Sequence, residues 1–358
     1  MKAAVWHGKE DIRIENVEDP VPGKDDVIIK VKYSGICGSD LHEYLFGPVF
    51  IPLEPHPLTN QCAPQILGHE FGGHIVDVGS EVKNLKKDDL VTVNPMITCS
   101  TCHYCEMDKH NLCDKFAFHG IIGNGGHAEF VKIKANSCFL MNGMDNPLSI
   151  AFSEPSAVCY HSVNMANVKP GMHVGILGGG AIGNLVAQFA RQAGAEQITL
   201  IEPSQLRKKM CQELGFVDRI FDPLDEDLHE KVLSVTDGLG FDASIECAGS
   251  DSTEHLMSSA QMAITFTRPL GNISIVGISG NSSEFQFNDI VFTEKKIVGS
   301  FAWHSHNEYK ESTQMIKDNK IVVNDLVSNI IQLDNYVKDG LHQLQHNKDN
   351  VMKILVEP

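Results

Sequence analysis

The sequence has 358 residues, of which 42% are hydrophobic and 21% are charged, and its formal net charge is −17. This length exceeds what one hydrophobic core usually serves, so we expect two domains. The acidic balance argues against a nucleic-acid-binding protein. Charges interrupt the N-terminal residues, and no apolar stretch is long enough to cross a bilayer, so we expect neither a signal peptide nor a membrane span, and a cytoplasmic protein.

Short apolar runs punctuated by Gly and Pro predict a β-rich region over about the first 150 residues. Strands are expected at residues 27–33, 74–78 and 90–93. Loops between such strands commonly carry the functional side chains of a protein. We therefore look for chemistry in the segments between these runs.

Residues suited to bind a metal are spread through this region and just beyond it. Cys37 lies in a Gly-Ile-Cys-Gly-Ser-Asp-Leu-His segment, His69 and Glu70 are adjacent, and Glu154 precedes a proline. One thiolate, one imidazole and one carboxylate can form an open zinc site that leaves a position for water or a substrate oxygen. The alternatives are a cysteine packed as a small core residue and a histidine in a local hydrogen bond.

Four more cysteines lie within fifteen residues. Four thiolates from one loop can close a tetrahedral shell around zinc, which makes a structural site with no open position. An iron–sulfur cluster and four unliganded cysteines are the alternatives. The ten cysteines of the chain are not expected to form disulfides in a reducing compartment. The residues of the predicted structural zinc site are Cys99, Cys102, Cys105 and Cys113.

The pattern changes near residue 170, where strand-like and helix-like runs begin to alternate. Strands are expected at 173–177, 197–201, 243–246 and 273–276, and helices at 184–193 and 205–214. Such alternation predicts a doubly wound parallel sheet of the Rossmann type. The chain then returns to mixed structure from about residue 297.

A glycine-rich turn follows the first of these strands. Gly178, Gly180 and Gly183 fit the G-x-G-x-x-G pattern, with Ala181 and Ile182 opening the helix that follows. The glycines allow a tight turn, close approach of a pyrophosphate and close packing of helix on strand, while the helix N-terminus attracts phosphate. This context predicts a dinucleotide site.

An acid stands at the end of the next strand. Glu202 follows Gly183 by about the expected twenty residues and is predicted to bind the adenosine ribose, which favours NAD over NADP. Arg207 is also assigned to the cofactor site, and with Lys208 it weakens the preference for NAD. A solvated surface glutamate is the alternative.

The order of these motifs, from the Cys37 segment to the glycine-rich turn, resembles the zinc-containing medium-chain alcohol and polyol dehydrogenases over essentially the whole chain. The resemblance implies an α/β protein with a GroES-like β-rich catalytic domain at residues 1–150 and 297–358. It implies a Rossmann NAD-binding domain at residues 151–296. It also implies NAD and two zinc ions per chain, one catalytic and one structural, and a homodimer or homotetramer.

The resemblance also implies roles for individual residues. Cys37, His69 and an acid would bind the catalytic zinc, with Glu154 favoured as the third ligand and Glu70 exchanging with it. Ser39 and His42 match the family's proton relay from substrate to solvent. Asp40 is expected to orient His69.

The segment at residues 43–59 resembles the butanediol dehydrogenase branch of this family. Phe46, Val49, Phe50 and Ile51 are expected to form an apolar wall near the zinc, suited to small methyl-flanked alcohols such as (R,R)-2,3-butanediol, or to acetoin in the reverse direction. A proline-stiffened surface loop is the alternative.

Two other functions stay open at this point. One is a sorbitol-like polyol or sugar-alcohol-phosphate dehydrogenase, and the other is a non-catalytic binding protein on the same fold. His127, and the stretch at residues 300–306, which is rich in histidine and aromatic residues, depart from what relatives carry and leave the substrate range uncertain.

Overall fold

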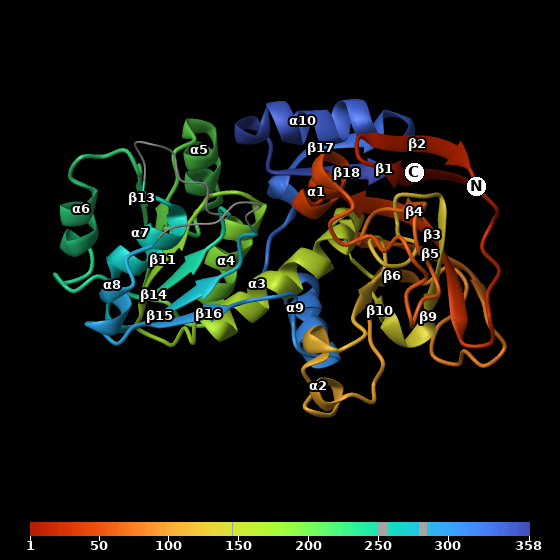
Figure 1. The fold of residues 1–358 in the computed structure, drawn as a ribbon, viewed down its shortest axis with the longest axis horizontal. Helices are drawn as coiled ribbons and strands as arrows, with labels where there is room; N and C mark the ends of the chain where they lie inside the picture. The colour runs from red at the N-terminus through yellow and green to blue at the C-terminus, as the bar shows by residue number, and fades with distance from the viewer. Residues whose placement is uncertain (145, 250–256, 279–284) are drawn as a thin grey trace. The chain divides into compact units, whose positions relative to one another are not determined.

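The computed structural model describes residues 1–144, 146–249, 257–278 and 285–358 (Figure 1). The chain divides into two compact units. The first comprises Met1–Pro155, Trp303–Asn319 and Val323–Pro358, and the second comprises Ser156–Ala302 and Lys320–Val322. The second unit is therefore inserted into the sequence of the first.

The main sheet of the first unit has seven strands in the order β10-β6-β5-β3-β18-β17, with β9 also pairing with β3. Apolar side chains of its central strands, including Val27, Ile29 and Ile75, form one of the buried clusters. The strands are β3 (Asp26–Gly35), β5 (Glu70–Val78), β6 (Leu90–Val93), β9 (Phe130–Lys134), β10 (Cys138–Leu140), β17 (Val327–Gln332) and β18 (Lys353–Glu357).

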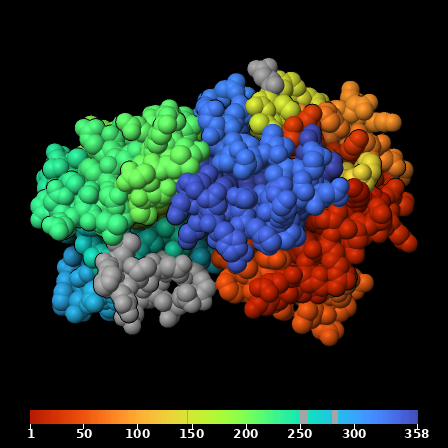
Figure 2. Space-filling view, turned by 90° about the horizontal axis from the view of Figure 1, so that it is seen from above, coloured from red at the N-terminus to blue at the C-terminus, as the bar shows by residue number. Residues whose placement is uncertain are grey.

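Strand β3 brings together segments that are far apart in the sequence. At its end, Gly35 lies opposite Glu70 of β5 on one side and Leu355 of β18 on the other. Figures 1 and 2 show the consequence, since the blue C-terminal segment lies beside the red N-terminal one. The register of three strands thus decides which side chains meet near residue 35.

Two smaller sheets and four helices complete the first unit. A second apolar cluster, which contains Trp6, Tyr44, Ile51 and Tyr336, packs beneath α1. The sheets are formed by β2 (Asp11–Asn16), β1 (Lys2–Gly8) and β4 (Gln65–Ile66), and by β7 (Met96–Ile97) and β8 (Ala117–Phe118). The helices are α1 (Gly38–Phe46), α2 (His103–Glu106), α9 (His306–Lys317) and α10 (His342–His346).

The second unit contains a parallel sheet of six strands in the order β13-β12-β11-β14-β15-β16. Crossovers between parallel strands are right-handed as a rule, so this strand order predicts α4 and α5 on one face of the sheet and α6 and α7 on the other, in agreement with Figure 1. The strands are β11 (His173–Leu177), β12 (Gln197–Ile201), β13 (Arg219–Phe221), β14 (Phe241–Glu246), β15 (Thr267–Ile275) and β16 (Lys296–Gly299). The helices are α4 (Ala181–Gln192), α5 (Gln205–Leu214), α6 (Leu228–Ser234), α7 (Ser259–Phe266) and α8 (Asn288–Val291), while α3 (Ser153–Met165) spans the boundary between the units.

The expected fold class, a β-rich region together with a doubly wound parallel sheet, is confirmed. The strands predicted at 173–177 and 197–201 are β11 and β12, and the helix predicted at 205–214 is α5. Helix α4 begins at Ala181, three residues before its predicted start, because Gly180 serves as its N-cap. Within the described residues, no helix combines the length and apolarity needed to span a membrane.

Candidate active site and metal centres

Cys37 lies where β3 gives way to α1. It is the N-cap residue of the helix, and its backbone N–H donates to the Asp40 carboxylate at 2.9 Å. Asp40 thus caps the helix from within its first turn, a common use of an acid at a helix N-terminus. The cap fixes the backbone that carries both the Cys37 thiol and the Ser39 hydroxyl.

The structure brings Cys37 together with His69 and Glu70. One ligand atom from each lies within 4.8 Å of the others, and both His69 and Glu70 are buried. Glu70 opens β5 and faces Gly35 of β3, so the sheet register delivers the carboxylate to the end of β3, next to the helix cap. A thiolate, an imidazole and a carboxylate are donor types that zinc accepts in an open site. These residues therefore fit a catalytic zinc.

A buried lysine holds the Glu70 carboxylate. Lys353, at the start of β18, donates to Glu70 Oε1 at 2.5 Å and to the carbonyl oxygen of Ile36 at 3.1 Å. A Cβ at Gly35 would overlap Glu70, so glycine provides the space for this pair. Lys353 was not singled out from the sequence, and its signal was a lysine opening an otherwise apolar strand.

The surroundings of His69 are strongly polar. Ser39 Oγ lies 3.3 Å from His69 Nε2, and Asp40 Oδ1 lies 3.8 Å from Nδ1. Burial alone would lower the pKa of His69, but Asp40, Cys37 and Glu154 overcome burial and raise it to about 10. Asp40 therefore lies beside the imidazole that it is expected to orient. Ser39, expected in the proton relay, also lies beside His69, while His42 is half-buried farther along α1.

Glu154 lies in the first turn of α3 and is buried. Burial raises the pKa of its carboxyl group to about 8, with His69 opposing and Glu70 adding to the shift. Glu154 is thus within electrostatic range of the site. The compact donor group, however, contains Glu70 and not Glu154.

A second histidine lies behind Asp40. His127 Nε2 is 3.7 Å from Asp40 Oδ2, and the His127 ring packs on Tyr336 with centroids 4.6 Å apart. Burial would raise the pKa of Asp40, but His69 and His127 overcome it and lower that pKa below its usual value. The departure noted at His127 therefore places an imidazole beside Asp40, the residue expected to orient His69.

Aromatic rings line one side of His69. Phe118 meets its imidazole edge-on at 5.7 Å, stacks on Phe116 at 5.7 Å and lies 5.8 Å from Trp303. Trp303 is fully buried and belongs to the stretch at 300–306 noted for its aromatic residues. These rings are an apolar surface at the donor set, and Phe116 and Phe118 were missed because isolated phenylalanines carry no motif.

The residues expected to form an apolar wall lie in two environments. Ile51 is buried in the cluster that contains Trp6 and Tyr44, so it is core and is not available to a substrate. Phe46, Val49 and Phe50 are exposed. The prediction for Ile51 is therefore wrong. Its side chain packs into the core and anchors the loop to it.

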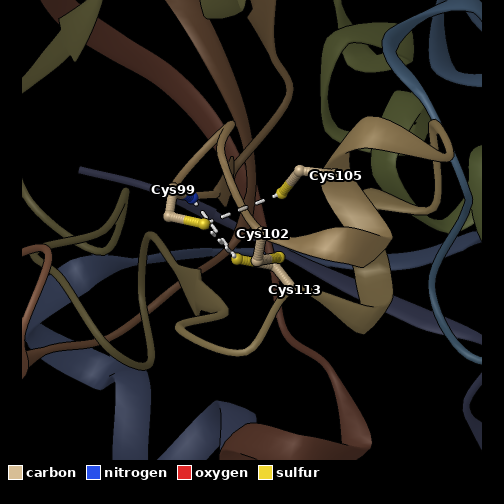
Figure 3. Close-up of side chains that lie close together, drawn as sticks. All are labelled: Cys99, Cys102, Cys105 and Cys113. Atoms are coloured by element: carbon tan, nitrogen blue, oxygen red, sulfur yellow. Dashed lines mark hydrogen bonds between the residues drawn. The ribbon is translucent and has the colours of Figure 1, made fainter.

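The four clustered cysteines converge on one point (Figure 3). Cys99 Sγ is 3.5 Å from Cys113 Sγ and 4.0 Å from Cys105 Sγ, and all four sulfurs lie within 4.8 Å of one another. Tetrahedral zinc with bonds of about 2.3 Å holds its sulfurs about 3.8 Å apart. The spacing therefore fits a single zinc ion, whereas the core of an iron–sulfur cluster would separate the thiolates further.

Backbone donors and burial act differently on these thiols. The backbone N–H of Thr101 is the main cause that lowers the pKa of Cys99 to about 6, and burial raises the pKa of Cys105 to about 12. The loop that carries the four cysteines, residues 99–113, is called the cysteine lobe below. It contacts a segment far away in the sequence: Lys109 Nζ lies 2.7 Å from His304 Nδ1, and His110 N donates to the His304 carbonyl oxygen at 2.7 Å.

The glycine-rich turn of the second unit lies between β11 and α4. Gly178 has φ 102°, which favours glycine, and a Cβ at Gly183 would overlap the Gly178 carbonyl oxygen. A Cβ at Gly180 would meet only the Arg207 guanidinium, 4.0 Å away. A ligand can therefore approach the backbone closely at Gly180. The Arg207 guanidinium and the N–H groups of Ala181 and Ile182 lie beside this space, an arrangement that fits a pyrophosphate.

Glu202 follows directly after β12 and contacts this turn. Its carboxylate is buried and accepts from Gly179 N at 2.5 Å and from Ser204 N at 2.7 Å. Each carboxylate oxygen can accept further hydrogen bonds, so both stay competent for a ribose hydroxyl. Glu202 is thus buried and hydrogen-bonded to the backbone of the turn, and it is not a solvated surface acid.

Two family models match the chain. The alcohol dehydrogenase GroES-like domain matches residues 23–143, and the zinc-binding dehydrogenase model matches residues 181–318. The GroES-like match lies in the first unit, and most of the second match lies in the unit with the parallel sheet.

Full-length relatives are found among curated proteins. An (R,R)-butanediol dehydrogenase of Bacillus subtilis is 36% identical over 100% of both chains, and one of Neisseria gonorrhoeae is 32% identical over 100% of this chain and 99% of its own. A sorbitol dehydrogenase of Halalkalibacterium halodurans is 30% identical over 100% of this chain and 99% of its own.

Solved structures agree with this picture. The crystal structure of 2R,3R-butanediol dehydrogenase from Bacillus subtilis superposes with a TM-score of 0.89 at 35% identity, covering 100% of this chain and 99% of that one. A structure from Sinorhizobium meliloti 1021, described as a zinc-binding dehydrogenase bound to NADP, gives 0.85 at 31% identity over 100% and 99%. The chain therefore belongs to the zinc-binding alcohol dehydrogenase family, oxidoreductases that act on CH–OH donors.

Proposed function

We propose that this protein is an NAD-dependent dehydrogenase of small secondary alcohols, with (R,R)-2,3-butanediol as substrate and acetoin as its oxidised partner. The observation that carries the reaction is the set of a thiol, an imidazole and a carboxylate from Cys37, His69 and Glu70, the last two buried, beside the Ser39 hydroxyl. The names of the two butanediol dehydrogenases that match over the full length support the substrate.

The donor set would bind the catalytic zinc, with Glu154 as the nearby second carboxylate. Zinc in such a site supplies a Lewis acid that favours loss of a proton from the alcohol. Ser39 would accept that proton, and His42, three residues later on α1, would carry it toward solvent. Asp40, whose Oδ1 faces His69 Nδ1 at 3.8 Å, would orient the His69 imidazole, and His127 lies 3.7 Å from the other carboxylate oxygen of Asp40.

The four-cysteine lobe would bind the second, structural zinc through Cys99, Cys102, Cys105 and Cys113. This site has four protein ligands and no free position, so its contribution is to the fold of the lobe. We therefore expect two zinc ions per chain with separate roles.

The second unit would bind NAD. Gly178, Gly180 and Gly183, with the first turn of α4 at Ala181 and Ile182, would approach the pyrophosphate. Glu202 would accept hydrogen bonds from the adenosine ribose, and its negative charge would oppose a 2′-phosphate. Arg207 beside Gly180 would pair with phosphate.

This assignment implies a division of labour along the chain. Residues 1–150 and 297–358 would act as the catalytic domain, and residues 151–296 as the NAD-binding domain. The active protein would be a homodimer or homotetramer, which light scattering of the purified protein measures directly.

The test is a substrate and cofactor panel. Purified protein is assayed with NAD and NADP against (R,R)-, (S,S)- and meso-2,3-butanediol, sorbitol and threonine, and with NADH and NADPH against acetoin, together with metal analysis. We expect oxidation of (R,R)-butanediol with NAD, reduction of acetoin with NADH, and two zinc ions per chain. Turnover of sorbitol without turnover of butanediol or acetoin would instead support the second candidate, a polyol dehydrogenase, which the 30% identity to a sorbitol dehydrogenase favours.

A further inference from the structure

A fully buried carboxylate lies at the C-terminal end of the helix that carries Ser39 and His42. Glu43 has 0% exposure, and its oxygens accept from the backbone N–H groups of Val49 at 3.0 Å, Ile51 at 3.1 Å and Phe50. None of the ion pairs found among the described residues involves it. Hydrogen bonds from the backbone of a turn therefore satisfy this buried carboxylate and tie the turn to α1.

The backbone of the same residue closes the turn from its other side. The Glu43 carbonyl oxygen accepts from Trp6 Nε1 and from Gly47 N, each at 3.0 Å. A Cβ at Gly47 would lie 2.7 Å from the Trp6 ring and 2.8 Å from the Glu43 carboxylate. Ile51 then enters the core cluster with Trp6, so residues 47–51 have little freedom to rearrange.

The far end of the segment reaches the aromatic rings beside His69. His56 accepts from Leu58 N at 3.3 Å through Nδ1, and its imidazole hydrogen-bonds the backbone of Phe116. Phe116 stacks on Phe118, which meets His69 edge-on. The segment from 47 to 56 thus runs between the catalytic helix and the apolar surface of the donor set.

Phe46 at the end of α1 and three residues of the segment between these fixed ends expose apolar side chains. Phe46, Val49, Phe50 and Leu53 have exposed fractions of 65%, 47%, 41% and 65%. A mobile loop with this composition would fold these groups away from water, because burial of apolar surface is favourable. The anchoring at Glu43 keeps them in one exposed arrangement.

We infer that Glu43 is a positioning residue for substrate selection. It holds the turn at 47–51 in one conformation, so that the apolar side chains of the segment contact the groups on either side of the alcohol carbon in a fixed arrangement. This inference rests on the proposed function. It predicts that weakening the Glu43 bonds relaxes the size limit of the substrate while leaving the metal and nucleotide sites unchanged.

The test compares Glu43→Gln with the matched variant Glu54→Gln, which removes the same charge from an exposed position in the same segment. Each is assayed with 2,3-butanediol and with 3,4-hexanediol, which differ only in methyl against ethyl flanking groups. Hydrogen exchange of the amides of Val49, Phe50 and Ile51 is measured in parallel, with zinc content and KM for NAD. Gly47→Ala disturbs the same turn with the carboxylate intact.

In Glu43→Gln we expect the preference for butanediol, as a ratio of kcat/KM values, to fall by about tenfold. We expect the three amides to exchange about tenfold faster or more. Gly47→Ala should show the same loss of preference, and Glu54→Gln should match the wild type. An unchanged ratio in Glu43→Gln despite faster exchange, or unchanged exchange, would overturn the inference alone. Wild-type protein that oxidises neither diol would overturn the proposed function and this inference with it.

Discussion

At the scale of single residues, the interior of the first unit contains several ionisable groups, and the contacts of each are specific. Lys353 pairs with Glu70, Asp40 lies between His69 and His127, and Glu43 is held by backbone N–H groups. Buried charge is costly unless it is paired or hydrogen-bonded, so these residues are unlike ordinary core. Their concentration around one donor set is typical of a functional site.

Cys37→Ser tests the catalytic metal. The substitution replaces the thiolate with a much weaker zinc ligand, so zinc should fall from two ions to one per chain. Turnover should fall about a thousandfold or more, because Lewis-acid stabilisation is worth several kcal/mol. Elemental analysis, circular dichroism and steady-state rates provide the readouts, with Cys62→Ser as the control. Retained turnover in Cys37→Ser with one zinc per chain would rule out the two-zinc assignment.

Glu202→Ala tests cofactor choice. Removing the acid at the end of β12 removes its hydrogen bonds to the ribose and its repulsion of a 2′-phosphate. We expect the ratio of kcat/KM for NAD over NADP to fall about tenfold or more, since hydrogen bonds to a charged group contribute about 1.5–3 kcal/mol each. Glu213→Ala, at an exposed position on α5, should leave the ratio unchanged. An unaltered ratio in Glu202→Ala argues against its role at the ribose.

At the scale of elements, α4 depends on two glycines for different reasons. Gly183→Ala would press a methyl group against the Gly178 carbonyl oxygen and should destabilise the protein by about 1–3 kcal/mol. Gly180→Ala meets only the end of Arg207, so the melting temperature should hold while KM for NAD rises. Thermal unfolding and cofactor titration separate the two effects. Equal loss of stability in both variants would contradict this division.

The segment that carries Cys99, Cys102, Cys105 and Cys113 would be held together by the proposed structural zinc. Besides α2 and a single 3-10 turn it has little regular structure, so Cys113→Ser should lower the melting temperature by about 5 °C or more. The turnover number kcat, which depends on the site at Cys37 and His69, should change much less, by about threefold at most. Calorimetry, zinc analysis and kcat together decide the point, and a variant with normal stability and normal zinc content would count against a structural metal.

At the scale of the whole molecule, the sequence predicts its parallel sheet, its glycine turn and its four-cysteine lobe well. Each of these is encoded by spacing within a short segment, where local geometry is enough. The setting of the donor group is encoded differently. Lys353 reaches Glu70 across 283 residues, and Phe118 reaches His69 through the fold, so neither partner leaves a local pattern.

Ile51 illustrates the same limit. Its position in an apolar segment predicts contact with a substrate as readily as contact with the core, and only packing around Trp6 and Tyr44 decides between them. The sequence also leaves open whether Glu70 or Glu154 completes the donor set, because each acid lies in a motif that the family resemblance assigns to the metal. The sheet register, which the sequence does not show, groups Glu70 with Cys37 and His69.

The insertion of one unit into the other has a consequence for synthesis of the chain. A ribosome that adds about 5–20 residues per second needs roughly 15–60 s to pass from Glu70 to Lys353, since 283 positions separate them. Throughout that time the whole parallel sheet of the second unit is made, while the Glu70 carboxylate has no ammonium partner. The unit with the parallel sheet can therefore fold on the ribosome before the donor set of the first unit acquires the Lys353 ammonium group.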